Sequence, residues 1–465
     1  MPESAAMAAD IAAACRELRR GEPEQSSAAV EELCRLATSP DHSVAQAGSD
    51  AIFRLIVEPL ADSFEPRDCD RYIGFFSRVV EYCRRLPGGR PLDEKLRSFG
   101  LRTEAEFLTR AGRARRVCAL PHGALQRTRK VLVLSRVTLG ADVAVTSVIL
   151  SRMKQLLPEA DICLLGSPKA SGLLASDGRV RLVPIEYRRD ATLLDRLNAW
   201  PALAETVAGE IQGLAAGEYL LVDPDSRLTQ LGLLPVTAGE SRYLFFESRS
   251  YSRASNECLA ALTGCWLDDV FGKAANPAYP YLSLSEGDRR RAESVRQALP
   301  GKIVAANLGV GDNARKRLAD PFEEELLLAL LEAGYKVLLD RGAGGEEIAR
   351  TGALCEALDR RGRKVLALNS DAAAIPSADV ITWEGSLSRF AGLIGVSDLY
   401  VGYDSAGGHL AGALGVPVID IFAGAASARM RRRWSPWGRS PAHVIEAGPE
   451  ADPRDILRQV RERLA

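Results

Sequence analysis

The pattern of hydrophobic positions along the chain changes near residue 128. Before that point apolar residues recur at helical spacing between proline and glycine breaks, and they predict helices over 26–36, 51–57 and 72–83. After it, short continuous apolar runs alternate with helical segments, as expected for parallel strands that are buried on both faces. The sequence therefore predicts an all-helical N-terminal domain, residues 1–127, followed by an α/β region.

The α/β region predicts two successive series of parallel strands joined by helices. A polar, proline-containing stretch at 276–280 separates the two series and is typical of an interdomain linker. We therefore expect two Rossmann-like domains, residues 128–280 and 281–465. The predicted strands are 131–134, 160–166, 181–185, 219–223 and 242–246 in the first domain, and 302–307, 335–340, 364–368, 398–402 and 417–422 in the second.

Composition and charge exclude several classes of protein. The 465 residues are enough for about three domains, and 46% of them are hydrophobic. The net charge of −1 argues against a nucleic-acid-binding protein, which usually carries a strongly basic domain. No apolar run is long enough to span a membrane, and Met1–Asp10 lacks the basic start of a secretory signal. A cytoplasmic protein is expected.

Cysteine and histidine usage gives no indication of a metal site. The nine cysteines are scattered without a Cys-x-x-Cys pair, which favours reduced thiols in a cytosolic protein. The four histidines show no paired spacing. We expect no metal ion and no organic cofactor.

A small-residue loop between a strand and a helix, within 399–417, is the most informative stretch. Asp404 and Ser405 stand at the strand exit, where helix N-caps occur. Ala406, Gly407 and Gly408 follow, so a ligand could approach the backbone N–H groups of the helix start. Such groups bind phosphate well, because the helix dipole adds a partial positive charge there. The alternative is a tight turn that binds nothing.

A second strand, glycine loop and helix occupy residues 130–157, with Gly140 and Asp142 on the loop. Both loops lie at the carboxyl ends of strands, where open α/β sheets bind their ligands. An aspartate at such a position can also serve simply as a helix N-cap.

Together the two stretches resemble glycosyltransferase family 9, the ADP-heptose lipopolysaccharide heptosyltransferases, over about residues 128–465. The resemblance implies a GT-B fold, in which two Rossmann-like domains face a cleft. It also implies inverting, metal-independent transfer of a heptose-like sugar from a nucleoside-diphosphate donor, with ADP as the expected nucleotide. The acceptor would be a hydroxyl of a cell-envelope glycan or glycolipid, such as the lipopolysaccharide core, reached at the inner face of the cytoplasmic membrane.

The resemblance also implies roles for residues of the Gly140–Asp142 loop and for Lys316 and His409. Asp142 would be the general base, with Gly140 beside it on the acceptor side, although the usual Leu-Gly-Asp is here extended by Ala141. Lys316 would stabilise the charge that develops on the leaving diphosphate, and His409 would either do the same or only pack the loop.

The same resemblance implies a set of donor-binding residues. Residues 404–409 match an Asp-Ser-Gly-x-x-His motif in which Ala406 replaces the glycine, and Leu318 stands where a tryptophan is usual. Either Glu346 or Glu347 would contact the donor ribose. The remaining donor-side positions are Asn307, Gly309, Lys316, Arg317, Ser405, Gly407 and Gly408.

Polar loops after two strands of the first domain are expected to border the acceptor, the alternative being ordinary surface turns. Their candidate residues are Asp225, Arg227 and Arg249. The basic run 429–434 either contacts a phosphorylated acceptor or an anionic membrane, or is a solvated loop. The helical domain is expected to pack against the rest of the chain or to dock a partner.

Two other functions remain open from the sequence. One is a nucleotide-sugar epimerase or hydrolase on the same fold, which needs no acceptor site. The other is a non-catalytic scaffold that binds a sugar nucleotide and recruits a partner through its helical domain.

Overall fold

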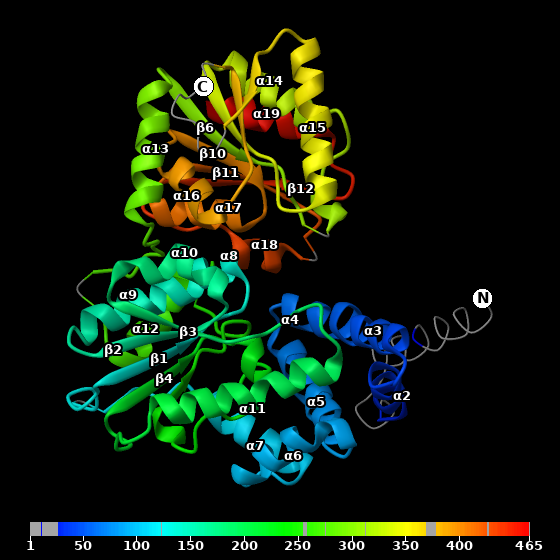
Figure 1. Ribbon diagram of the computed structural model, residues 1–465, viewed down its shortest axis with the longest axis vertical. Helices are drawn as coiled ribbons and strands as arrows, with labels where there is room; N and C mark the ends of the chain where they lie inside the picture. Colours follow the sequence, from blue (N-terminus) through cyan, green and yellow to red (C-terminus); the bar gives the residue numbers. More distant parts are fainter. Residues whose placement is uncertain are drawn as a thin grey trace.

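Two parallel β-sheets and a group of N-terminal helices make up the molecule (Figure 1). The computed structural model describes residue 11 and residues 27–121, 123–253, 258–274, 276–311, 313–368, 378–425 and 427–464. The predictions that concern Met1–Asp10, Cys15 and His122 lie outside these residues. None of the helices in the described ranges combines the length and the hydropathy needed to cross a membrane.

The N-terminal region is helical, as predicted. Local signals set its helix ends: the Asp41 carboxylate accepts hydrogen bonds from the backbone N–H groups of Ser43 and Val44, and Thr103 and Glu106 form a capping box. The elements are α2 (Ser27–Ala37), α3 (His42–Asp50), the π-helix η1 (Ala51–Val57), α4 (Glu58–Asp62), α5 (Pro66–Cys83), α6 (Arg90–Ser98) and α7 (Glu104–Ala114).

The first sheet is entirely parallel and has the strand order β3-β2-β1-β4-β5. Its strands are β1 (Lys130–Leu134), β2 (Asp161–Gly166), β3 (Val180–Pro184), β4 (Tyr219–Asp223) and β5 (Tyr243–Phe245). Its helices are α8 (Leu139–Ala141), the π-helix η3 (Asp142–Thr146), α9 (Ser147–Leu156), α10 (Ser171–Leu174), α11 (Leu193–Glu210) and α12 (Leu259–Phe271).

The second sheet is also parallel, in the order β12-β11-β10-β6-β7-β9-β8. Its strands are β6 (Lys302–Asn307), β7 (Tyr335–Asp340), β8 (Val365–Ala367), β9 (Val380–Trp383), β10 (Leu399–Tyr403), β11 (Val418–Ala423) and β12 (Ala442–Ala447). Its helices are α13 (Glu286–Ala298), α14 (Phe322–Glu332), α15 (Gly345–Arg360), α16 (Leu387–Gly395), α17 (Ala406–Leu414), α18 (Ala428–Trp434) and α19 (Pro453–Leu464).

All ten predicted strands are present, but β9 and β12 were not predicted. β9 has only four residues, and β12 lies at the sheet edge, where only Ile445 and Ala447 are buried. Such short or half-exposed strands give a weak hydrophobic signal. Six short 3-10 turns complete the elements: η2 (Pro87–Gly89), η4 (Pro168–Ala170), η5 (Ala175–Asp177), η6 (Arg227–Thr229), η7 (Glu240–Arg242) and η8 (Ala314–Lys316).

The N-terminal helices share a hydrophobic core with the first sheet. Successive residues of β1 face opposite sides, as the pleat requires. Val131 and Val133 pack into the core that contains α9 and α12. Leu132 and Leu134 belong instead to a core that includes Phe76 of α5 and Trp200 of α11. The helices therefore cover one face of this sheet and do not form a core of their own. The domain limits at 127 and 280 stay predictions.

Candidate active site

The two predicted glycine loops meet at the junction of the two sheets. Figure 1 places α8 and α18 at this junction, between the upper and lower halves of the molecule. Gly140 lies so close to the other loop that a side chain there would come within 3.3 Å of His409 Cδ2 and 3.4 Å of Ala406 Cα. Residues about 266 positions apart in sequence thus face each other, as a site between two domains requires.

The donor-side loop connects β10 to the first turn of α17. Ser405 is the N-cap, and its hydroxyl accepts a hydrogen bond from the Gly407 N–H at 3.3 Å. A side chain at Gly407 would lie 2.0 Å from the Tyr400 hydroxyl, so only glycine fits. Ala406 has no left-handed backbone conformation, which explains why alanine can replace the family's glycine here.

Lys316 is held against this loop. Its ammonium group lies 2.5 Å from Asp404 Oδ2 and donates to the Asp404 carbonyl at 3.2 Å. The structure does not bring Arg317 to the same place. Arg317 is extended and points the other way, where its Nε donates to Glu323 at 2.8 Å. Lys316 ends the 3-10 turn η8 and Arg317 continues in an extended conformation, so the two side chains leave the backbone in different directions and only Lys316 reaches the loop.

His409 is buried one turn into α17 and is only 7% exposed. Burial lowers the pKa of His409 to about 4, with Asp404 acting in the opposite direction. The imidazole is therefore neutral near pH 7. Its ring packs edge-on against Trp434, with 5.8 Å between the centroids. It can offer a hydrogen bond to a phosphate, but not a positive charge.

Asp420 is a residue of this site that the sequence analysis missed. It lies on β11 opposite Gly402, and its carboxyl oxygens have no hydrogen-bond partner among the described residues. Burial, together with the nearby Asp404, raises the pKa of Asp420 well above its usual range. Burial thus favours the neutral form of this carboxyl group, which lies behind the donor-side loop. Its signal in the sequence is an aspartate inside the otherwise apolar predicted strand 417–422.

The other predicted donor-side residues surround the ends of β6 and β7. Asn307 donates to Asp340 at 2.6 Å and accepts from the Gly309 N–H at 3.1 Å. Of the two alternative glutamates, Glu346 is exposed, whereas Glu347 accepts from the Gly311 N–H at 2.9 Å. The structure therefore favours Glu347 and not Glu346 as the residue beside this loop.

Asp142 is buried on the acceptor side and accepts three hydrogen bonds from its own domain. The donors are the Ser135 hydroxyl at 2.6 Å, the Arg136 N–H at 2.7 Å and the Thr146 hydroxyl at 2.7 Å. Burial raises the pKa of Asp142 despite these bonds. A carboxylate has about four lone-pair sites, so one on Oδ2 remains for a further donor.

The extra alanine of the Leu139–Asp142 loop is accommodated by a π-helical turn. Residues Asp142–Thr146 form the π-helix η3, closed by the Ser147 N–H bonded to the Asp142 carbonyl. A π turn contains one residue more than an α turn, and such turns are frequent at functional sites. The additional residue is thereby absorbed after Asp142, while all five residues of the turn stay buried.

The acceptor-side candidates form a buried polar chain. Arg136 donates to the Ser248 hydroxyl at 2.7 Å, and that hydroxyl donates to Asp225 Oδ2 at 2.9 Å. Asp225 also pairs with Arg249 at 2.7 Å. Asp225 has a left-handed backbone with φ of 68°, which is uncommon for a residue other than glycine. The burial of Asp225 and Arg249 contradicts the alternative that these loops are ordinary surface turns.

The helical domain reaches into this region. The Tyr72 hydroxyl on α5 accepts from Arg227 at 3.3 Å and donates to Gln230 at 2.9 Å. Tyr72 lies outside the stretches that were expected to form the site, whereas Arg136 and Ser248 lie within them but were not among the candidate residues. No sequence motif indicated them, because their roles depend on contacts between distant segments.

Helix α18 joins all three parts of the molecule. The Trp434 ring packs edge-on against Phe64 of the helical domain at 6.1 Å, and Arg136 lies 5.7 Å from its centroid. Arg433 is buried beside Phe64, and Arg429 pairs with Glu65 at 3.6 Å. The basic run 429–434 is therefore not a solvated loop. Its contacts are largely internal.

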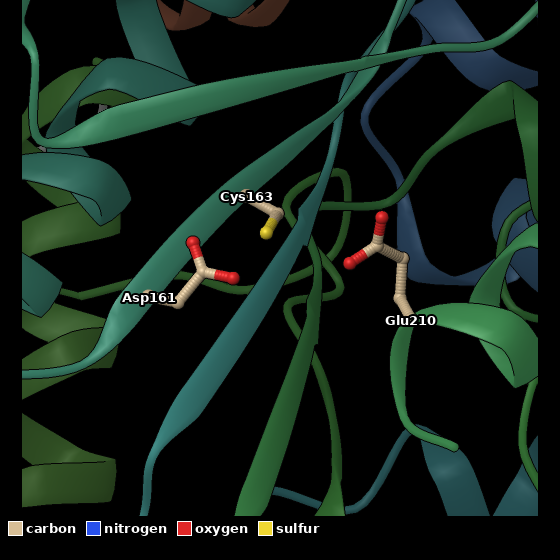
Figure 2. Close-up of side chains that lie close together, drawn as sticks. All are labelled: Asp161, Cys163 and Glu210. Carbon is tan, nitrogen blue, oxygen red and sulfur yellow. The ribbon is translucent and has the colours of Figure 1, made fainter.

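Figure 2 shows Asp161, Cys163 and Glu210, which form the one group of possible metal ligands found among the described residues. Arg181 already lies 3.1 Å from Asp161 and 2.6 Å from Glu210, and its hydrogen bond lowers the pKa of Glu210 to about 2. Lys130 is a second cation beside Glu210, at 2.9 Å. The group lies near the amino ends of β1 and β2, whereas the two glycine loops lie at the carboxyl ends of their strands. We therefore interpret the group as an ion-pair network.

Comparison with known proteins places the chain in a class. Residues 237–459 match the family model described as glycosyltransferase family 9 (heptosyltransferase). The matched segment contains the donor-side loop, so the match confirms the resemblance for this part of the chain. The protein is a glycosyltransferase of the GT-B fold, preceded by a helical region, and residues 237–459 resemble family 9.

Several solved structures are similar to it. The glycosyl transferase family 9 protein from Veillonella parvula DSM 2008 is 16% identical with a TM-score of 0.50, covering 69% of this chain and 86% of that one. E. coli ADP-heptose lps heptosyltransferase II is 19% identical with a TM-score of 0.46, covering 72% and 98%. E. coli heptosyltransferase WaaC with ADP is 16% identical with a TM-score of 0.47, covering 72% and 100%. No curated protein matches the sequence.

Proposed function

We propose that this glycosyltransferase is an inverting, metal-independent enzyme. In this proposal it transfers a heptose-like sugar from a nucleoside-diphosphate donor, with ADP as the nucleotide, to a hydroxyl of a cell-envelope glycan or glycolipid such as the lipopolysaccharide core. The family description supports the choice of sugar. The single observation that carries the proposal is the meeting of Gly140 with the α17 N-terminus, on which Lys316 is held through Asp404.

The α17 N-terminus and Lys316 supply what a departing diphosphate needs. The first turn of α17 begins with backbone N–H groups, of which that of Gly407 is capped by the Ser405 hydroxyl, and the helix dipole adds partial positive charge there. Lys316 is beside them and can exchange its contact with Asp404 for a phosphate oxygen. Such fixed charges stabilise a developing anion without any metal ion.

Asp142 supplies the base in the proposed reaction. The acceptor hydroxyl attacks the anomeric carbon and loses its proton to Asp142. The bond between that carbon and the diphosphate oxygen breaks, and its electron pair leaves with the phosphate. The raised pKa of Asp142 suits this task, since a base works best when its pKa lies closer to the operating pH.

Nucleotide binding followed by turnover tests the proposal. We expect ADP and ADP-sugars to raise the melting temperature without added metal, and UDP and GDP to do so less. A ligand at 100 times its Kd stabilises by about 2.7 kcal/mol. Release of ADP from ADP-heptose should require an added glycan acceptor.

Each other outcome has a distinct meaning. ADP release that needs no acceptor would identify a hydrolase, and isomerisation of the sugar would identify an epimerase. Dependence on a divalent cation that EDTA removes would contradict the metal-independent mechanism. No response to any nucleotide would contradict the proposed donor.

A further inference from the structure

Three arginines converge on the acceptor side of the junction with unused donors. Arg136 and Arg249 are 5% and 6% exposed, and Arg227 is half-buried. The Ser248 and Asp225 side chains connect Arg136 to Arg249 in one hydrogen-bonded chain. Burial and the neighbouring charges of Arg249 and Arg227 lower the pKa of Arg136, so the three guanidinium groups form one cluster, carried by the loops that follow β1, β4 and β5.

The hydrogen bonds within this cluster leave guanidinium N–H donors without an acceptor among the described residues. The guanidinium of Arg136 donates only to the Ser248 hydroxyl, and that of Arg227 only to the Tyr72 hydroxyl at 3.3 Å, within the part of the chain that the structure describes. The Nε of Arg249 is buried without an acceptor among the same residues. Asp62 faces Arg227 but forms no ion pair with it in those ranges. Buried donors without acceptors are costly, so the cluster is short of an anion.

We propose that Arg136, Arg227 and Arg249 bind a phosphate or carboxylate carried by the acceptor, and that α5 of the helical domain forms one wall of this site. Planar guanidinium groups match such anions through paired hydrogen bonds. The inference rests on the proposed function, because it takes this side of the junction as the acceptor side.

The wall formed by α5 gives the helical domain a task in substrate recognition. The Tyr72 ring lies 5.5 Å from the Arg227 guanidinium, and its hydroxyl links Arg227 to Gln230. Gln230 and the neighbouring Leu231 both have left-handed backbones, with φ of 49° and 58°. Tyr72 thus orients Arg227 from a segment that is about 155 residues away in sequence.

Binding of simple anionic sugars to the full chain tests the site. The probes are glucose 6-phosphate, glucuronate, glucose and inorganic phosphate, titrated by calorimetry. We expect at least one anionic sugar to bind and glucose not to bind. Arg227→Gln should weaken that binding about tenfold or more, and Arg227→Lys should weaken it less. Arg188→Gln is the matched control, since Arg188 is exposed and, among the residues that the structure describes, pairs only with Asp190.

Several results would overturn the site. One is unchanged binding in Arg227→Gln; another is loss of binding only in Lys316→Gln, which would place the anion at the donor-side loop. Inorganic phosphate binding as tightly as both anionic sugars would show a free-anion site and contradict an acceptor-borne group. Arg136→Gln is a second variant, with circular dichroism melting to verify folding.

ADP binding, measured on the same samples, separates this inference from the proposed function. If ADP binds and Arg227→Gln changes nothing, the anion site fails alone. If ADP does not bind but the anionic sugar binds through Arg227, the proposed donor fails alone. Tyr72→Phe should reduce anionic-sugar binding severalfold while leaving ADP binding unchanged, because it removes only the hydroxyl that orients Arg227.

Discussion

The donor-side loop, Asp404–His409, and the acceptor-side loop, Ser135–Asp142, both join a buried parallel strand to a helix, but they satisfy their polar groups differently. The donor-side loop rests on glycines, a helix N-terminus and one ion pair with Lys316. In the acceptor-side loop, the buried Asp142 carboxylate accepts three hydrogen bonds. One loop offers donors to a ligand, and the other holds a base in place.

The geometry of the donor-side loop therefore depends mainly on local sequence, whereas the geometry of the acceptor side depends on contacts from all parts of the chain. The loop expected to hold the diphosphate lies within one strand–helix unit, whereas Lys316, Asp420, Asn307 and Glu347 come from other elements of the same domain. The acceptor side draws on α5, on α18 and on the loops after β1, β4 and β5. Four predictions would break or sharpen this contrast.

The largest effect is expected for Asp142→Asn, which keeps the shape of the side chain but removes the base. Turnover should fall by about 10² to 10⁴, while the Kd for ADP changes less than about twofold. Asp223→Asn is the matched control. Asp223 is equally buried and accepts from Ser226, Thr229 and Tyr243, so its variant should lose stability but keep most of the turnover. Equal turnover losses in both variants would assign Asp142 a structural role.

Lys316→Ala should weaken donor binding without reaching the acceptor-side loop. Loss of one charge-assisted contact to a phosphate is expected to raise the Kd for ADP by about 10- to 100-fold. Calorimetry at low and high salt measures it, and the wild-type affinity should fall more steeply with salt. Arg315→Ala is the control, because Arg315 is the exposed neighbour on the same turn. A Kd unchanged in Lys316→Ala would remove Lys316 from the donor site.

Replacing a glycine of the donor-side loop by alanine should lower the free energy of unfolding, and the loss should be larger where the added methyl group clashes more closely with a neighbour. At Gly407 the new carbon would lie 2.0 Å from the Tyr400 hydroxyl, and at Gly408 it would lie 3.1 Å from Pro436 Cγ. Gly407→Ala should therefore cost about 1–3 kcal/mol of unfolding free energy. Gly408→Ala should cost clearly less. Chemical denaturation gives both values, and the reverse order would mean that Tyr400 moves aside freely.

The smallest effect concerns the pH dependence of stability through His409. Its pKa is about 4 in the folded protein, below the usual value of about 6.5, so only the unfolded chain binds a proton between these values. Stability is therefore fully present above about pH 6.5 and falls as the pH decreases towards 4, by about 2 kcal/mol at pH 5. Urea unfolding at about pH 6.5 and pH 5 gives the free energy of unfolding of the wild type and of His409→Gln. The difference between the two proteins in how far this free energy falls isolates the contribution of His409. Equal pH dependence in both would contradict the buried neutral histidine.

The positions of Lys316 and Arg317 show where sequence reasoning ends. Both were expected at the donor site, because a pattern of residue types does not say which way each side chain points. The structure turns Lys316 to Asp404 and Arg317 to Glu323. The choice between Glu346 and Glu347 was decided in the same way, by the helix face that each occupies.

The sequence alone was enough to predict ten of the twelve strands that the structure describes, the two glycine loops and the resemblance to family 9, because hydrophobic periodicity and helix-start residues act over a few neighbouring positions. Only the tertiary structure decided that Tyr72 meets Arg227, that Trp434 joins Phe64 to Arg136, and that the helical region covers a face of the first sheet. Those contacts join segments separated by tens to hundreds of residues. Burial and packing, which no local pattern encodes, select them.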